Sequence, residues 1–156
     1  MPYLQAVSQE ALRVHPAVGL PLERVVPARG LHLAGYYFPE GSIVGVNAWL
    51  VHYDEYVYGS DAATFRPERW LDSDKEQLAK MNRNWMPFGL GSRTCIGKNI
   101  SMLEMSKLLP ELVRRFDFEL VSSLEGGVDD LEVIYHWFVI PRRLQVRVQP
   151  RQTRAT

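Results

Sequence analysis

The chain contains one cysteine, Cys95, and this single thiol limits its possible folds more than any other feature of the sequence. One cysteine excludes a disulfide framework and a zinc site made of several cysteines, so the fold has to be held by its own core. The 156 residues suit one domain, and 46% of them are hydrophobic against 23% charged, a balance typical of globular proteins. Cys95 is therefore either a small buried hydrophobe or the centre of the chemistry.

Charge and hydropathy exclude further classes of protein. The 18 Lys and Arg residues balance the 18 Asp and Glu residues, so no nucleic-acid partner is expected. No apolar run reaches the length of a membrane span, and the best stretch, 43–51, carries Gly45 and Asn47. The N-terminus lacks the basic start and apolar segment of a signal peptide. We expect a soluble chain without anchor or signal, on the cytoplasmic side if it is expressed.

Apolar spacing predicts two long helices, over residues 3–14 and 97–116. Pro110 lies inside the second helix and should kink it, because its ring removes the bond to the Ser106 carbonyl. Residues 59–94 show little periodicity, and an uninterrupted loop of that length is functional or disordered. Turn residues and alternation predict the other elements: an extended passage at 17–27, two short strands within 31–47, a short helix at 47–58, and strands at 131–137 and 144–148 joined near Pro141. These elements describe a mainly α fold with small β-sheets (α+β).

Cys95 lies in a glycine-rich segment, 88–97, directly before the second long helix. Glycines there allow tight turns and the close approach of a flat ligand. The helix N-terminus and Arg93 both favour the thiolate over the thiol, so Cys95 could be a metal ligand or a nucleophile. None of the four histidines has a spacing that pairs it with Cys95 as a base. The segment lacks the third glycine of a dinucleotide-binding fingerprint.

Two Glu-x-x-Arg pairs occur in the chain, Glu10 with Arg13 and Glu111 with Arg114. Each pair lies on one face of a helix, and by itself each is expected to be a solvated ion pair of small energetic value. The segment 65–70, Phe-Arg-Pro-Glu-Arg-Trp, indicates a turn with aromatic anchors at its ends.

Taken in this order, these motifs resemble the C-terminal part of a cytochrome P450, a haem-thiolate monooxygenase. The resemblance spans nearly the whole chain, from the family's helix K through the cysteine loop and the following helix to the last strands. It implies an incomplete C-terminal portion of that domain over 1–149 and a frayed polar tail over 150–156. The family's haem-binding signature matches at each defining position: Phe88, Gly91, Arg93, Cys95 and Gly97.

The resemblance implies a role for each matching residue. Cys95 would bind the haem iron as the proximal thiolate, and backbone N–H groups near Ile96 and Gly97 would hydrogen-bond its sulfur. Phe88 would pack against the porphyrin, and Arg24 and Arg93 would pair with haem propionates. A second set, Glu10, Arg13 and Arg69, would form a buried ion network that braces the fold.

The implied activity is insertion of one oxygen atom from dioxygen into a lipophilic organic substrate, in fungal secondary metabolism. Residues 17–21 and 138–140 would contact the substrate, although core packing explains them equally well. An NADPH-cytochrome P450 reductase would supply electrons and dock near Lys98. The chain is much shorter than members of the family, so we expect it to be truncated from a parent anchored in the endoplasmic reticulum membrane. Two alternatives are an inactive fragment or pseudogene product that binds haem weakly, and a haem-thiolate isomerase or dehydratase.

Overall fold

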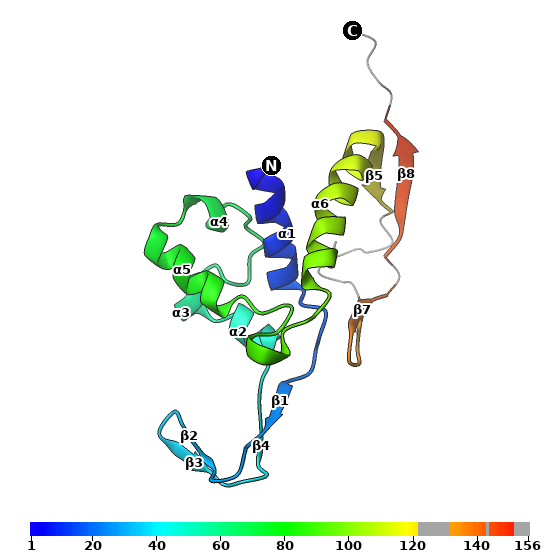
Figure 1. Cartoon of the computed structure of the whole chain (residues 1–156). Coiled ribbons are helices and arrows are strands. Elements are labelled where there is room, and N and C mark those ends of the chain that lie inside the picture. Colours follow the sequence, from blue (N-terminus) through cyan, green and yellow to red (C-terminus); the bar gives the residue numbers. More distant parts are fainter. Residues whose placement is uncertain (122–131, 143, 152–156) are drawn as a thin grey trace.

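The computed structural model describes residues 1–121, 132–142 and 144–151 (Figure 1). The first element, α1 (Pro2–Val14), begins with Pro2, whose missing N–H would lack an intrahelical partner in the first turn anyway. It ends at Val14, because Pro16 disfavours helical geometry in the residue before it, His15. Both ends agree with the predicted helix.

Four short strands follow α1 and form two antiparallel pairs. β1 (Leu22–Val25) pairs with β4 (Ile43–Val46), and β2 (Leu31–Leu33) pairs with β3 (Tyr36–Phe38). The β2–β3 hairpin turns at Ala34 and Gly35, which both have positive φ, as the tight turns of two-residue hairpins require. The passage predicted to be extended, 17–27, contains β1. The region 31–47, predicted to hold two strands, holds three: β2, β3 and β4.

Four short helices follow the strands: α2 (Ala48–His52), α3 (Glu55–Tyr58), α4 (Arg69–Asp72) and α5 (Lys75–Asn84). The single helix predicted over 47–58 is wrong, because Asp54 begins a second helix by accepting a hydrogen bond from the Tyr56 N–H. The long loop predicted over 59–94 is also wrong, since it contains α4 and α5. α5 packs on the buried cluster through two side chains three positions apart, Leu78 and Met81, which is too short an apolar pattern to predict a helix from the sequence.

The C-terminal part consists of α6 (Lys98–Arg115) and two more strand pairs. α6 continues through Pro110. β5 (Phe116–Leu120) pairs with β8 (Val146–Pro150), and β6 (Val133–Tyr135) pairs with β7 (Val139–Pro141).

The two strands predicted over 131–137 and 144–148 correspond to β6 and β8, and they do not bond to each other: β6 pairs with β7 and β8 pairs with β5. Pro141, predicted as the junction between them, is the last residue of β7. Leu131, the first residue of the predicted strand, lies outside the described residues. The predicted frayed tail is described only at Pro150, which ends β8, and at Arg151, whose N–H donates to the Arg115 carbonyl.

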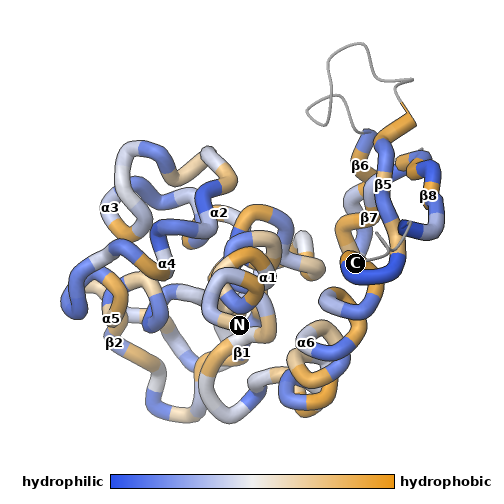
Figure 2. The backbone as a smooth tube through the Cα atoms, turned by 90° about the horizontal axis from the view of Figure 1, so that it is seen from above, coloured by the Kyte–Doolittle hydropathy of each residue, from blue (hydrophilic) through white to orange (hydrophobic). Residues whose placement is uncertain are grey.

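Figure 1 shows α1 between the group of short helices α2–α5 and the long helix α6, with β5 and β8 beside α6. The buried cluster lies on the α2–α5 side and comprises Ala6, Val57, Tyr58, Ala62, Trp70 and Met81. No residue of α6 is buried, although hydrophobic positions recur along it (Figure 2). In the described ranges, no helix has both the length and the apolar character needed to cross a membrane.

Candidate functional site

Glu10 is the centre of a buried polar network. The side chain is 0% exposed and accepts five hydrogen bonds. Oε1 accepts from Arg13 Nη2 at 2.8 Å, from Arg69 Nε at 2.9 Å and from the Arg66 N–H at 2.9 Å. Oε2 accepts from Arg13 Nε and from Trp70 Nε1, both at 2.9 Å. Burial acts to raise the pKa of Glu10, but these donors outweigh it and hold the pKa below its usual range.

The two arginines of the network are also fully engaged with backbone carbonyls. Arg13 Nη1 donates to the carbonyls of His52 at 2.6 Å and Ala62 at 2.7 Å. Arg69 Nη1 donates to the Tyr58 carbonyl at 2.7 Å and to the Asp61 carboxylate at 3.1 Å. The predicted buried network of Glu10, Arg13 and Arg69 is confirmed. It fixes the segments around α2, α3 and α4 to one face of α1.

His52 is a residue of this region that the sequence analysis missed. Its ring is completely buried, and its two nitrogens lie 3.0 Å from the Arg13 carbonyl oxygen and 2.9 Å from the Met86 backbone nitrogen. No local motif marks this histidine, because its partners lie 39 and 34 positions away in the sequence.

The cysteine loop follows Met86 and is closed by its own backbone hydrogen bonds. The Gly89 N–H donates to the Met86 carbonyl at 3.0 Å, and the Cys95 N–H donates to the Phe88 carbonyl at 2.8 Å. Gly89 and Gly91 both have φ of +71°, a left-handed conformation that favours glycine. The loop then enters α6, where the Lys98 N–H donates to the Cys95 carbonyl. This geometry explains why glycines stand at these two positions.

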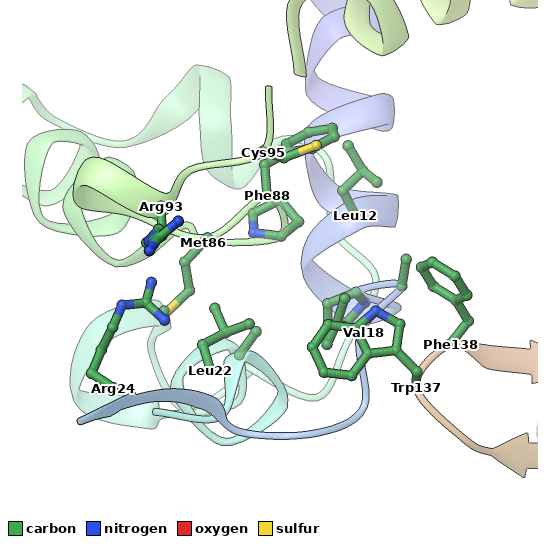
Figure 3. A pocket seen from close by; sticks show the side chains of 15 residues that line it. Leu12, Val18, Leu22, Arg24, Met86, Phe88, Arg93, Cys95, Trp137 and Phe138 are labelled. Atoms are coloured by element: carbon green, nitrogen blue, oxygen red, sulfur yellow. The ribbon is translucent and has the colours of Figure 1, made fainter. Parts of the chain in front are cut away.

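A cavity of about 480 Å³ adjoins the loop, and Cys95 forms part of its wall (Figure 3). Phe88, Arg24 and Arg93 also line it, so four of the predicted site residues surround one space. The remaining lining residues come from α1, the segment after it, β1, α2, the start of the cysteine loop and the β6–β7 turn. They are Leu12, Pro16, Ala17, Val18, Leu22, Ala48, Met86, Pro87, Gly89, Trp137 and Phe138.

The cavity has a cationic side and an apolar side. Figure 3 shows the guanidinium groups of Arg24 and Arg93 on one side, and Trp137 and Phe138 on the opposite side. Within the described ranges neither arginine forms an ion pair with a carboxylate. Arg24 Nη1 donates to the Glu23 carbonyl, at 2.6 Å. Two guanidinium groups on one wall, neither paired with a carboxylate of the described residues, are suited to bind carboxylates of a ligand.

These residues fit the haem that the resemblance implies. The cavity offers one soft sulfur ligand, apolar walls for a flat macrocycle, and two guanidinium groups for its two propionates. In the part of the chain that the structure describes, no three metal-ligating side chains come together.

Gly91, Ile96 and Gly97 do not line the cavity. The Ile96 side chain is exposed, and Gly91 has open space where a Cβ would stand. Gly97 lies beside the sulfur, because a Cβ there would be 3.8 Å from Cys95 Sγ. The roles of the Ile96 and Gly97 N–H groups toward the sulfur remain predictions. Lys98 places its ammonium group 5.7 Å from the centre of the Trp85 ring.

Comparison with known proteins places these observations in one family. The family model described as "Cytochrome P450" matches residues 1–132. A pisatin demethylase of Fusarium vanettenii is 54% identical over 152 residues, which are 97% of this chain and 28% of that protein. The cytochrome P450 monooxygenase cicH of Emericella nidulans is 42% identical over 151 residues, 97% of this chain and 29% of that protein.

Solved structures agree with the sequence comparisons. A retinoic acid bound cyanobacterial CYP120A1 superposes with a TM-score of 0.79 at 30% identity, over 96% of this chain and 33% of that structure. The chain spans about a quarter of the length of the curated relatives it matches. From its fold, its cysteine loop and these likenesses, we conclude that the chain belongs to the cytochrome P450 family.

Proposed function

We propose that this chain forms the cysteine-bearing part of a haem-thiolate monooxygenase that acts on a lipophilic substrate. The observation that carries the proposal is the convergence of Cys95, Arg24 and Arg93 on one largely apolar cavity. When bound there, haem would supply the activation of dioxygen for insertion of one oxygen atom into the substrate. The chain's own part is to hold the iron through Cys95 and to orient the macrocycle through the two arginines.

The substrate would contact the apolar end of the cavity. Val18, Trp137 and Phe138 lie on that side, and they come from the two segments expected to contact substrate, or directly beside them. Val18 and Phe138 are joined by an isolated antiparallel bridge, so the two segments form one surface. An apolar surface of this kind favours lipophilic ligands and excludes water from bound haem.

The relatives support a finer proposal on biology. They are fungal monooxygenases, and two of them are named pisatin demethylases. We therefore propose a role in fungal secondary metabolism, with removal of a methyl group from a lipophilic compound as the first reaction to assay. Family members receive electrons from redox partners, and for a fungal member we propose an NADPH-cytochrome P450 reductase that docks near Lys98.

The carbon-monoxide difference spectrum of the reduced chain, prepared with haem, tests this function. We expect a strongly red-shifted Soret band in the wild-type chain and none in Cys95→Ser, because only thiolate ligation gives that shift. Arg24→Gln and Arg93→Gln serve as matched variants. Each should weaken haem binding about tenfold, the value of one charged hydrogen bond, and leave the band position unchanged because the sulfur remains. A folded wild-type chain without the band, or a band that persists in Cys95→Ser, would contradict the proposal.

A further inference from the structure

His52 lies at the C-terminal end of α2 with both of its ring nitrogens hydrogen-bonded. Nδ1 is 3.0 Å from the Arg13 carbonyl oxygen, and Nε2 is 2.9 Å from the Met86 backbone nitrogen. A backbone nitrogen only donates, so Nε2 accepts and carries no hydrogen. A carbonyl oxygen only accepts, so Nδ1 carries the hydrogen and donates. The geometry thus selects one neutral tautomer of His52.

On one side, His52 is joined to the buried ion network. Arg13 Nη1 donates to the His52 carbonyl at 2.6 Å, while His52 Nδ1 donates to the Arg13 carbonyl. The two residues are therefore bonded to each other in both directions. Since Arg13 also makes two hydrogen bonds to the Glu10 carboxylate, the position of the imidazole is fixed by the network.

On the other side, His52 accepts a hydrogen bond from the N–H of Met86, which lies just before the cysteine loop. The Met86 carbonyl accepts from the Gly89 N–H, which closes the turn in which Phe88 lies. The Phe88 carbonyl in turn accepts from the Cys95 N–H at 2.8 Å. The Met86 and Phe88 side chains line the cavity together with Cys95 (Figure 3).

We propose that His52 is a positioning residue that couples the buried network of Glu10, Arg13 and Arg69 to the Met86 amide, and thereby sets where Cys95 presents its sulfur. A histidine that only filled core space would need no fixed tautomer and no bond to this loop. Burial also lowers the pKa of His52 to about 4, which keeps Nε2 free to accept at neutral pH. Of the tests of this proposal, only the haem measurement rests on the proposed function.

The tautomer of His52 in the wild-type chain is the first test, and it requires neither haem nor a variant. The ring ¹⁵N chemical shifts distinguish a protonated from an unprotonated nitrogen. We expect Nδ1 to be protonated and Nε2 to be unprotonated at neutral pH. The opposite tautomer, or an imidazolium, would overturn the proposal, because Nε2 could then not accept from Met86.

Two substitutions separate the two hydrogen bonds of the ring. The amide of His52→Asn can occupy the place of Nδ1 but does not reach Met86, whereas His52→Gln can place its oxygen where Nε2 stood. We expect hydrogen exchange of the Met86 amide to be about tenfold faster in His52→Asn and within about threefold of wild type in His52→Gln. Equal Met86 exchange in the two variants would overturn the proposal.

His15→Asn is the matched control. His15 also makes a single ring-to-carbonyl contact, 3.1 Å from its Nε2 to the Val139 oxygen, but it has no contact with the cysteine loop among the described residues. Its substitution should leave Met86 exchange at the wild-type rate. Faster exchange of Met86 in this control would show that loss of any neighbouring imidazole loosens the loop, and it would overturn a specific role for His52.

The haem measurement then tests whether the position of the cysteine loop affects how Cys95 binds the haem iron. In the carbon-monoxide spectrum, His52→Asn should lose intensity of the red-shifted band relative to His52→Gln and His15→Asn. Equal spectra in the three variants would overturn the proposal that His52 sets the position of the Cys95 sulfur. If wild-type chain binds no haem while the tautomer and the Met86 exchange behave as expected, the proposed function fails and the coupling of His52 to the loop stands.

Discussion

Glu10 and Glu111 occupy the same Glu-x-x-Arg motif, and the structure places them in opposite environments. Glu10 is 0% exposed and holds two arginines, whereas the Glu111 side chain is 42% exposed and pairs with Arg114 at the surface. Spacing alone gives both pairs the same prediction. The difference arises from Arg69, which lies 59 positions from Glu10, and from the backbone carbonyls that surround Arg13.

Substitution of Glu10 by Gln tests the value of the buried carboxylate. The change keeps the shape of the side chain but removes the carboxylate that pairs with buried Arg13, and it leaves buried Arg69 with the partly exposed Asp61 as its carboxylate partner. We expect the free energy of unfolding to fall by about 3–5 kcal/mol, or the chain to fail to fold. Urea unfolding measures the effect. Glu111→Gln is the matched control and should leave the urea midpoint unchanged, since exposed pairs contribute little. Equal losses in the two variants would contradict this difference.

The site residues that sequence could predict are those with a local motif. The cysteine loop resembles a family signature, and Cys95, Phe88 and Arg93 lie together on the cavity wall. His52 and Met86 carry no such signature, because their contacts join segments that are distant in the sequence. A buried histidine with an acceptor and a donor role can be identified only when its partners are placed in space.

At the scale of the element, α1 buries its polar side more completely than its apolar side. Glu10 and Arg13 are fully buried, while Leu12 is half-buried at the cavity and Ala11 is exposed. Periodicity predicts the extent of this helix correctly, but the spacing of apolar residues does not indicate that Glu10 and Arg13 are its most deeply buried side chains. An apolar stripe normally marks the buried face of a helix because buried polar side chains need hydrogen-bond partners. In α1 the hydrogen bonds around Glu10 provide those partners, so polar side chains are buried here.

Pro110 in α6 permits a prediction about a single element. Proline removes one hydrogen bond inside the helix, and α6 has no buried residues that would compensate by packing. We expect Pro110→Ala to raise the free energy of unfolding by about 1–3 kcal/mol and to slow amide exchange in residues 111–115. Lys107→Ala, on the same helix, should change stability by less than about 0.5 kcal/mol. A destabilised Pro110→Ala chain would mean that the proline ring itself is packed in a required position.

At the scale of the whole molecule, acid stability depends on His52, which burial keeps uncharged, and on Glu10, which its hydrogen-bond donors keep ionised despite burial. His52 has a pKa of about 4 in the folded chain and an ordinary value of 6.5 when unfolded. Between these values the unfolded chain binds the additional proton, so acidification favours unfolding. Glu10 acts in the same direction at lower pH, since its lowered pKa means that its contribution is lost only below its ordinary value of 4.5.

The two groups can therefore be separated by the pH at which stability falls. Between about pH 7.5 and about pH 5 we expect a loss of about 2 kcal/mol from His52 alone, measured by urea unfolding. His52→Gln carries no titratable ring and should remove this dependence, because it leaves the Glu10 network to respond only at lower pH. His15→Asn should keep the full loss. If the dependence between these pH values is unchanged in His52→Gln, then a different group controls the acid stability of the chain.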